Sequence, residues 1–251
     1  MSWLQAGQGR AVVLLHAFPV AAEMWKPQLD AVPHGWTMIA PDLPGFGESS
    51  GGSAPTHVDD HADAVLALMR HLNIEQAAIG GLSMGGYITF AIHRKAPQRF
   101  RAMILADTRA EADTNEAKAG REKMQAAVRE KGAPAAADAM LPKLLGDNGS
   151  GVNPQSIAVR EIILKNGTQG IVDAIEALKT RPDSTPTLKQ ISCPALVIVG
   201  DQDEVTPIPL SEVMAREIAQ ATLTVIPGAA HLANLQQPDA FNRALWAFLT
   251  P

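Results

Sequence analysis

The sequence contains a single cysteine, Cys193, among its 251 residues. One thiol cannot form an internal disulfide, which is typical of proteins from a reducing compartment. The shortage also excludes a cysteine-rich metal site, because such a site needs several thiolates. Cys193 stands directly before Pro194 at the start of an apolar run, so we expect it to pack as a small, inert side chain.

Long basic runs and long apolar runs are also missing. Lys and Arg never follow one another for more than two residues, and the net charge is −5. Nucleic acids and anionic membranes attract clustered positive charge, so we expect neither as a partner. The start, "MSWLQAGQGR", has no basic segment, and the "AVVLL" after it is too short for a signal peptide core or a membrane span. A cytoplasmic location is therefore expected.

Short apolar runs separated by helical patterns are what the chain does have. The runs are "AVVLLHA", "WTMIAP", "QAAIGGL", "RAMILAD", "PALVIVG" and "ATLTVIP". All but the last are almost continuously apolar, as strands are when helices cover both faces of a parallel sheet. With 46% hydrophobic residues, the chain can bury one sizeable core. The predicted fold class is α/β, with a doubly wound and mostly parallel sheet.

The alternation of strand and helix stops between about residues 110 and 187. Amphipathic segments near 116–131, 134–145, 154–166 and 168–181 are separated by Pro and Gly signals such as "KGAP" and "RPDSTP". This pattern predicts a cap of about four helices, 110–187, inserted into a core formed by 1–109 and 188–251. The cap region contains no Phe, Tyr or Trp.

A serine surrounded by glycines, in "AAIGGLSMGG", stands where a predicted strand meets a predicted helix. The chain must reverse sharply there, which places Ser83 at the apex of a strained turn. We expect Gly81 and Gly85 beside it because side chains would collide across the turn. The N–H of Met84, at the start of the helix, points where negative charge can be stabilised. Taken alone, G-x-S-x-G fits equally a glycine-rich turn with a capping serine.

The context of the serine resembles the α/β-hydrolase superfamily over nearly the whole chain. "LLHAFPVAAEMW" is similar to the family's HG-x-P segment, and "APDLPGFGESS" to its next strand and turn. "GGLSMGG" resembles the nucleophile elbow, "PALVIVGDQDEVTP" the acid loop, and "IPGAAHLANLQQP" the histidine loop. Within the family, the chain resembles serine carboxylesterases and enol-lactonases.

This resemblance implies a catalytic triad of Ser83 as nucleophile, Asp203 as orienting acid and His231 as general base. A serine hydroxyl reacts poorly until an imidazole takes its proton, and a carboxylate fixes that imidazole's tautomer. The backbone N–H groups of Met84 and Phe18 are the implied oxyanion donors. Neither a metal nor an organic cofactor is implied, and the partner is a small ester or lactone substrate.

The chain departs from the family pattern in several places. Ala17 and Ala230 stand where the family usually has glycine, and only about ten residues precede the first core strand, so we expect a shortened opening hairpin. Asp107, at the end of "RAMILAD", is a rival acid, interpreted as a cap-facing or structural carboxylate. Asp201 is interpreted as a turn residue.

Other polar residues receive structural interpretations. His57 and His61 have the i, i+4 spacing of some zinc ligands, but H-E-x-x-H lacks its Glu here, so we expect a solvated surface turn. Thr56 is the expected N-cap of the helix that follows. We expect His16 to be a structural hydrogen-bonding residue and Asp42 to organise a turn.

The expected function is hydrolysis of small carboxylic esters through an acyl-enzyme. Enol-lactonases of aromatic-acid breakdown are the nearest alternative. In those enzymes the strand corresponding to "RAMILAD" is followed by "NTA" and by a cap that contains tryptophan. This chain has "DTRAEADT" there, and its cap contains no tryptophan. Perhydrolysis without a cofactor is a further alternative. From another class, a ligand receptor on a hydrolase scaffold also fits. The aliphatic cap predicts acyl chains of about two to six carbons.

Overall fold

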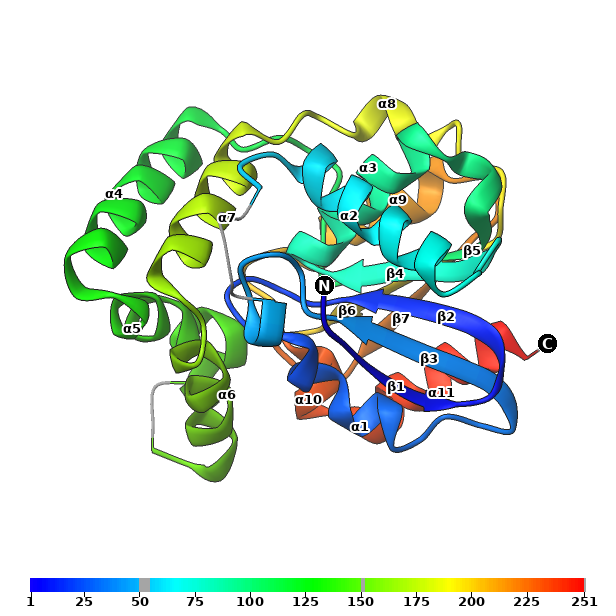
Figure 1. The fold of residues 1–251 in the computed structure, drawn as a ribbon, viewed down its shortest axis with the longest axis horizontal. Coiled ribbons are helices and arrows are strands. Elements are labelled where there is room, and N and C mark those ends of the chain that lie inside the picture. Colours follow the sequence, from blue (N-terminus) through cyan, green and yellow to red (C-terminus); the bar gives the residue numbers. More distant parts are fainter. Residues whose placement is uncertain (50–54, 150–151, 251) are drawn as a thin grey trace.

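The computed structural model describes residues 1–49, 55–149 and 152–250. Its centre is a seven-stranded sheet in the order β1-β3-β2-β4-β5-β6-β7 (Figure 1). Six strands are parallel and coincide with the six predicted runs: β2 (Gly9–Leu15), β3 (Gly35–Pro41), β4 (Ala77–Leu82), β5 (Phe100–Ala106), β6 (Ala195–Gly200) and β7 (Ala221–Ile226). Every residue of β4 and β6 is buried, which accounts for their continuous apolar sequence. The predicted fold class is confirmed.

The seventh strand, β1 (Trp3–Gly7), was not predicted as a strand. It pairs antiparallel with β3 at the edge of the sheet, with Leu4 opposite Ala40. Gln5 and Gly7 are exposed, and the strand lies at the edge of the sheet. Its sequence therefore lacks the continuous apolar pattern that predicts the buried strands. The antiparallel opening of the chain is thus reduced to one short strand.

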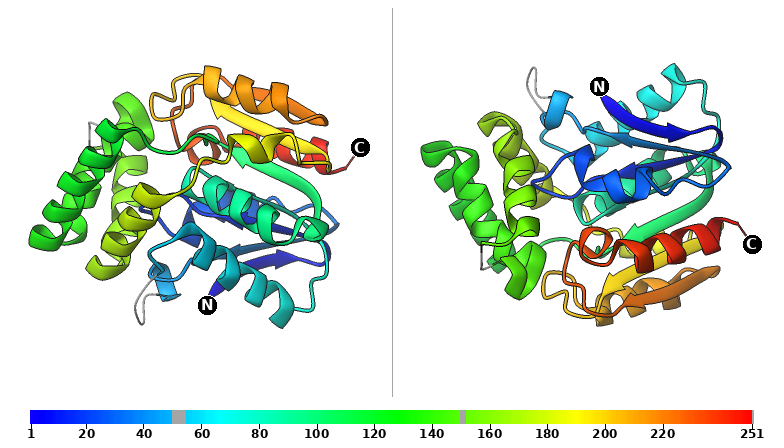
Figure 2. Two further views of the ribbon diagram at one scale, coloured as in Figure 1. Left: turned by 90° about the horizontal axis from the view of Figure 1, so that it is seen from above. Right: turned by 90° about the horizontal axis from the view of Figure 1, so that it is seen from below.

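Helices cover both faces of the sheet (Figures 1 and 2). One face carries α2 (Val58–His71), α3 (Met84–Lys95) and α9 (Ile208–Glu217), and the other carries α1 (Lys26–Leu29), α10 (Ala233–Gln236) and α11 (Pro238–Leu249). Short 3-10 turns occupy Ala22–Trp25, Gly47–Ser49, Pro97–Arg99 and Gly146–Gly149. The N-cap of α2 is His57 and not the predicted Thr56, and its side chain makes no capping bond.

Four helices lie between β5 and β6 in the chain, at the segments predicted for them. They are α4 (Asn115–Lys131), α5 (Ala133–Leu145), α6 (Pro154–Leu164) and α7 (Thr168–Thr180), and the short α8 (Thr185–Leu188) leads back to the core. We call Asn115–Thr180 the helical insertion. It lies beyond the carboxyl ends of the parallel strands, set apart from the two covering layers (Figures 1 and 2).

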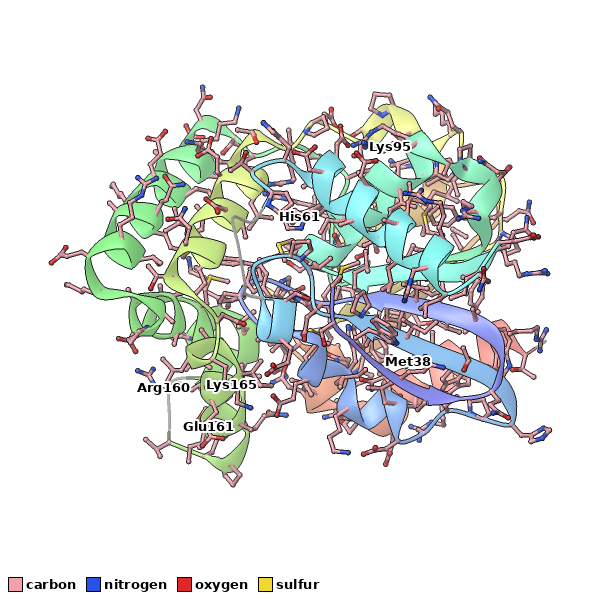
Figure 3. The ribbon with its side chains drawn as sticks, viewed as in Figure 1. Met38, His61, Lys95, Arg160, Glu161 and Lys165 are labelled. Carbon is pink, nitrogen blue, oxygen red and sulfur yellow. The ribbon has the colours of Figure 1, made fainter. Side chains whose placement is uncertain are left out.

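The helical insertion has its own apolar interior. Val128, Ile163 and Ile175 are fully buried, and α4 packs on α7 while α5 packs on α6. Arg160 and Glu161 on α6, and Lys165 directly after it, lie at the outer rim of the molecule (Figure 3). Within the described ranges, no helix has both the length and the apolar character needed to cross a membrane.

Candidate active site

Ser83 connects the end of β4 to the start of α3 with a backbone conformation that L-residues rarely adopt. Its φ is 55° and its ψ is −110°. A Cβ on Gly81 would meet the backbone of Gly85, and one on Gly85 would meet the backbone of Leu15. The expectation that only glycine fits beside the serine is confirmed. Such strain persists only where the surrounding structure enforces it, which is typical of functional sites.

The neighbouring strand holds this turn in place. The Ser83 N–H donates to the carbonyl of Ala106 at 3.0 Å, and the Thr108 hydroxyl donates to the Ser83 carbonyl at 2.9 Å. Gly86 lies so close to Thr108 that a side chain there would overlap it. Ser83 is only 9% exposed, so its position is fixed by contacts on all sides and not by the turn alone.

Asp203, in the loop after β6, accepts hydrogen bonds on both of its carboxylate oxygens. Oδ1 accepts the N–H groups of Val205 and Thr206 at 2.8 and 3.0 Å, and Oδ2 accepts the Thr206 hydroxyl at 2.6 Å. Burial acts to raise the pKa of Asp203, but the charge and hydrogen bond of His231, with the bonds from Thr206, lower it to about 2. The carboxylate is therefore ionised at any ordinary pH.

His231 follows β7 and meets Asp203 directly. Its Nδ1 lies 2.8 Å from Oδ2 of Asp203, and the His231 side chain is 1% exposed. Because parallel strands end at one edge of the sheet, Ser83, Asp203 and His231 all lie at that edge. The structure joins Asp203 to His231, but the hydrogen bonds of the described residues include none between Ser83 and His231. Such bonds are often long before a substrate binds.

The backbone N–H groups of Phe18 and Met84 lie on two segments at this same edge. Phe18 follows β2, and Met84 is the first residue of α3. Among the residues that the structure describes, neither group has an acceptor within hydrogen-bond distance. The first N–H groups of a helix have no partner inside the helix, so the Met84 donor is free to bind an anion.

Asp107, the rival acid, forms its hydrogen bond with the backbone and not with His231. Its Oδ1 accepts the N–H of Gly200 at 2.8 Å, its φ is 41°, and it is completely buried. Oδ2 makes no hydrogen bond of good geometry within the described part of the chain, but the backbone N–H of Ala233 lies near enough to the carboxylate to oppose the rise in its pKa. Burial first, and then the charge of Asp203, raise the pKa of Asp107 well above its ordinary value. Its hydrogen bond to the Gly200 backbone fits the interpretation of Asp107 as a structural carboxylate.

The expectation of a solvated turn at His57 and His61 is wrong for His61. His57 is exposed, but His61 is completely buried, on the side of α2 that carries Val58 and Val65 (Figure 3). Its spacing from these residues, three and four positions, belongs to the apolar stripe and was a signal available in the sequence. Burial, with the charge of His16, lowers the pKa of His61 to about 4, and the Pro55 carbonyl opposes this shift.

Three polar residues have the structural roles expected of them. His16 is buried between the Ala17 carbonyl, 2.9 Å from Nδ1, and the Leu43 N–H, which donates to Nε2 at 3.0 Å. Asp42 accepts N–H groups from two turns, and Asp201 accepts the N–H of Gly228 at 2.7 Å. Cys193 is partly buried against the core, and burial raises its pKa.

A buried ionic cluster at the neck of the helical insertion was missed by the sequence analysis. The Asp113 carboxylate pairs with Arg109, Arg121 and Arg181 at 2.9, 3.0 and 2.7 Å. Arg181 also lies over the ring of Tyr87, one helical turn after Ser83, at 4.2 Å from its centroid. Arg109 is four positions from Asp113 and Arg121 is eight, but Arg181 follows the far end of the helical insertion, so no local pattern predicts its place in the cluster.

A side-chain amide, Asn166, forms a second unpredicted link. It lies between α6 and α7, donates to the carbonyl of Pro19 at 2.7 Å and accepts the N–H of Gly47 at 2.8 Å. Asn166 is 4% exposed. It therefore ties the helical insertion to the segment that carries Phe18 and to the turn after β3.

The alpha/beta hydrolase fold family matches residues 10–238, most of the chain. The chain belongs to this family. Among curated members, 3-oxoadipate enol-lactonase 2 of Acinetobacter baylyi is 33% identical over 242 residues, 95% of this chain and 88% of that protein. A thermophilic esterase from Thermogutta terrifontis, solved with malate bound, has a TM-score of 0.94 at 37% identity and covers 99% of this chain and 92% of its own. The enol-lactonase of Burkholderia xenovorans has a TM-score of 0.91 at 27% identity, with 100% and 96% covered.

Two departures from this α/β-hydrolase pattern fit their surroundings in the structure. Ala17 is fully buried, and its N–H lies 3.3 Å from the sulfur of Met24. Ala230 is also buried and faces Gly146, where an added Cβ would lie 3.4 Å from the Ala230 methyl group.

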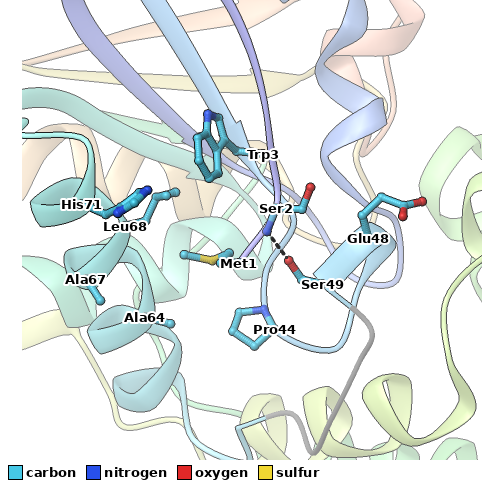
Figure 4. Close-up of a pocket in the computed structure, with 10 residues that line it drawn as sticks. All are labelled: Met1, Ser2, Trp3, Pro44, Glu48, Ser49, Ala64, Ala67, Leu68 and His71. Carbon is cyan, nitrogen blue, oxygen red and sulfur yellow. Dashed lines mark hydrogen bonds between the residues drawn. The ribbon is translucent and has the colours of Figure 1, made fainter.

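This α/β-hydrolase chain also has cavities that do not include Ser83 or His231 among their lining residues. One of about 680 Å³ lies between the start of β1, the turn at Pro44 and the outer face of α2, near His71 (Figure 4). The Ser2 N–H donates to the Ser49 hydroxyl at 2.8 Å on its wall. No group of three or more potential metal ligands was found among the described residues.

Proposed function

We propose that this protein is a serine hydrolase that cleaves small carboxylic esters through an acyl-enzyme. The observation that carries the proposal is the buried pair of Asp203 and His231, 2.8 Å apart, at the sheet edge where Ser83 occupies a strained turn. A histidine that is oriented by a carboxylate beside a serine hydroxyl is the arrangement that activates a serine.

In the proposed reaction, Ser83 Oγ attacks the ester carbonyl carbon and passes its proton to Nε2 of His231. The N–H groups of Met84 and Phe18 stabilise the oxyanion of the tetrahedral intermediate. The carbon–oxygen bond to the alcohol then breaks, and His231 returns the proton to the leaving oxygen. A water molecule, deprotonated by His231, attacks the acyl-enzyme and releases the acid and free Ser83. Asp203 holds His231 in one tautomer throughout and stabilises its cation.

Relatives of known activity support this class of reaction. The thermophilic esterase and the two enol-lactonases share the fold over nearly their whole length. Both activities break an ester bond, and the same triad serves an open-chain ester and a cyclic one. The cap proposed for residues 110–187 would cover the site, and the small-molecule substrate would lie between it and Ser83.

An enol-lactonase is the second candidate, favoured by the 33% identity to the Acinetobacter baylyi lactonase. The absence of aromatic residues from 110–187 argues for the general esterase. Turnover of matched open-chain esters and lactones of equal carbon number separates the two. A kcat/KM at least 100-fold higher on enol-lactones would assign the lactonase activity.

The experiment that tests the proposal compares the wild type with Ser83→Ala on such a panel. We expect kcat to fall by about 10⁵- to 10⁶-fold in the variant, the scale for losing a serine nucleophile, while the fold is kept. A fluorophosphonate should label Ser83 alone. Labelling of a different serine, or retained activity in the variant, would contradict the proposal. Tight ligand binding without hydrolysis would instead assign a receptor.

A further inference from the structure

The two backbone N–H groups on either side of His231 are both connected to the end of one helix of the insertion. The N–H of Leu232 donates directly to the carbonyl of Leu144 at 3.0 Å. The N–H of Ala230 donates to Oε1 of Gln236 at 2.7 Å, and Nε2 of Gln236 donates to the carbonyl of Leu145 at 3.1 Å. His231 is thus held between consecutive carbonyls of α5.

The end of α5 explains why these carbonyls are available. The last four carbonyls of an α-helix have no partner inside the helix and must find donors elsewhere. At Gly146 the chain turns away with a φ of 58°, a conformation that favours glycine, so α5 stops at Leu145. The histidine loop supplies donors to two of the free carbonyls. These hydrogen bonds satisfy polar groups of both segments and hold the histidine loop against the end of α5.

A second glutamine offers a contrast. Gln155, on α6 of the same insertion, donates to the carbonyl of Leu235 at 3.0 Å. This bond also joins the insertion to the histidine loop and α10, and Gln155 is part-buried like Gln236. It does not, however, touch either residue that flanks His231. The two glutamines therefore differ in whether they act on the backbone of the proposed base.

We propose that Gln236 is a positioning residue, which couples the end of α5 to His231 and makes the helical insertion part of the frame that holds the general base. This inference rests on the proposed function. Gln236 touches no reacting atom, so it acts only through the backbone on the N-terminal side of His231. The bond from Leu232 holds the C-terminal side, and both must be in place to fix the direction of Nε2.

The chemical consequence follows from the demands of proton transfer. A base has to lie within about 2.6 to 3.2 Å of the proton it takes, and a misplacement of about 1 Å can cost 10²-fold in rate. Loss of the Gln236 link frees one side of His231 and leaves Ser83 and the proposed oxyanion donors as they are. The defect should therefore appear in the chemical step and not in substrate binding.

The experiment compares Gln236→Ala, Gln236→Glu and the control Gln155→Ala in the full-length protein. For Gln236→Ala we expect kcat to fall by about 10- to 100-fold with KM nearly unchanged, and the rate of fluorophosphonate labelling to fall by the same factor. Gln236→Glu keeps an acceptor for the Ala230 N–H but places a carboxylate against the Leu145 carbonyl, so it should also lose activity. Gln155→Ala should keep the wild-type kcat.

A proton NMR signal gives a measurement that does not depend on turnover. The Nδ1 proton of His231, bonded to Asp203 in a buried site, should give a low-field resonance in the wild type and in Gln155→Ala. The resonance should broaden in Gln236→Ala, where His231 moves. Wild-type kcat in Gln236→Ala, or an equal loss in Gln155→Ala, would overturn the positioning role. A wild type that neither hydrolyses esters nor reacts with fluorophosphonate would instead overturn the proposed function, and the resonance would still decide the position of His231.

Discussion

Nδ1 of His231 lies 2.8 Å from Oδ2 of Asp203, and both side chains are almost completely buried. The same oxygen accepts the hydroxyl of Thr206 at 2.6 Å, so two donors converge on it. Asp107 directly follows the neighbouring strand β5 and is equally buried, but its Oδ1 accepts the backbone N–H of Gly200. The two carboxylates are therefore in very different bonding situations, and their substitution should have different effects.

The first prediction separates these two acids by activity. Asp203→Asn should lower kcat by about 10⁴-fold, because an amide favours the wrong tautomer of His231. Asp107→Asn should cost far less, since the amide oxygen still accepts the Gly200 N–H. Steady-state kinetics on one ester, with circular dichroism to verify folding, measures both. If Asp107→Asn is the more damaging change, the acid of the triad belongs to β5.

The second prediction concerns the pH dependence of stability that Asp107 introduces. Its pKa is raised in the folded protein, so the unfolded chain loses this proton first as pH rises above about 4. The stability that the protonated group contributes is present at low pH and is lost as pH rises towards the folded pKa. Asp107→Asn cannot ionise, and its Tm relative to the wild type should therefore increase from pH 4 to pH 8.

The control for this measurement is Asp138→Asn, which changes an exposed carboxylate on α5. Thermal unfolding at four or five pH values should show a nearly constant Tm difference for the control. A constant or decreasing difference for Asp107→Asn would mean that Asp107 is ionised in the folded protein at neutral pH.

The third prediction is that His61→Leu stabilises the protein, and more strongly in acid. Neither ring nitrogen of His61 makes a hydrogen bond of good geometry in the described part of the chain, and the Pro55 carbonyl is the one backbone group that acts on its pKa as an acceptor. Its pKa is about 4 when folded and 6.5 ordinarily, so stability is lost as pH falls from 6.5 towards 4. The full shift corresponds to roughly 3 kcal/mol. Leu removes both the proton uptake and the unpaired polar atoms.

Urea unfolding at pH 5 and pH 8 measures this effect, with His34→Leu as an exposed control. The gain for His61→Leu in the free energy of unfolding should be larger at pH 5 than at pH 8. A variant that is less stable than the wild type at both values would show that the ring makes a favourable polar contact, for which the Pro55 carbonyl is the candidate.

The fourth prediction concerns the length of the acyl chain. The apolar side chains of the helical insertion are aliphatic and none is aromatic, and several of them are fully buried, including Val128, Leu144, Ile163, Ile171 and Ile175. Few remain to form a pocket over Ser83, so we expect acyl chains of about two to six carbons to be preferred. Each methylene that fits should gain up to ~0.8 kcal/mol, until the pocket is full.

The measurement is kcat/KM for p-nitrophenyl esters from acetate to palmitate. We expect a rise and then a fall within the first few members of the series. A maximum at ten carbons or more, or a jump in rate above the solubility limit, would indicate a lipase with a large or opening pocket.

Features that depend on near neighbours in the chain were determined by the sequence. Five of the six parallel strands follow from continuous apolar runs and β7 from an alternating one. The four helices of the insertion follow from their period and from the Gly and Pro residues between them. The tight approach of Gly81 and Gly85 at Ser83 is local as well, because a sharp turn brings residues four apart into contact. These patterns also place Asp203 and His231 after strands that end at one edge.

Contacts between distant segments were decided only by the tertiary structure. Packing of separate elements decides the pairing of β1 with β3, the ion pair of Arg181 with Asp113 and the link from Gln236 to Leu145. The sequence around a hydrogen-bonding side chain does not indicate its partner. The same holds for Asp107, whose bond to Gly200 joins residues 93 positions apart. The burial of His61 lies between the two cases. Its helical spacing from Val58 and Val65 predicts a buried position, whereas the charged Asp59 and Asp60 beside it indicate an exposed turn. A sequence therefore fixes which chemical groups reach the sheet edge, and packing decides what holds each of them there.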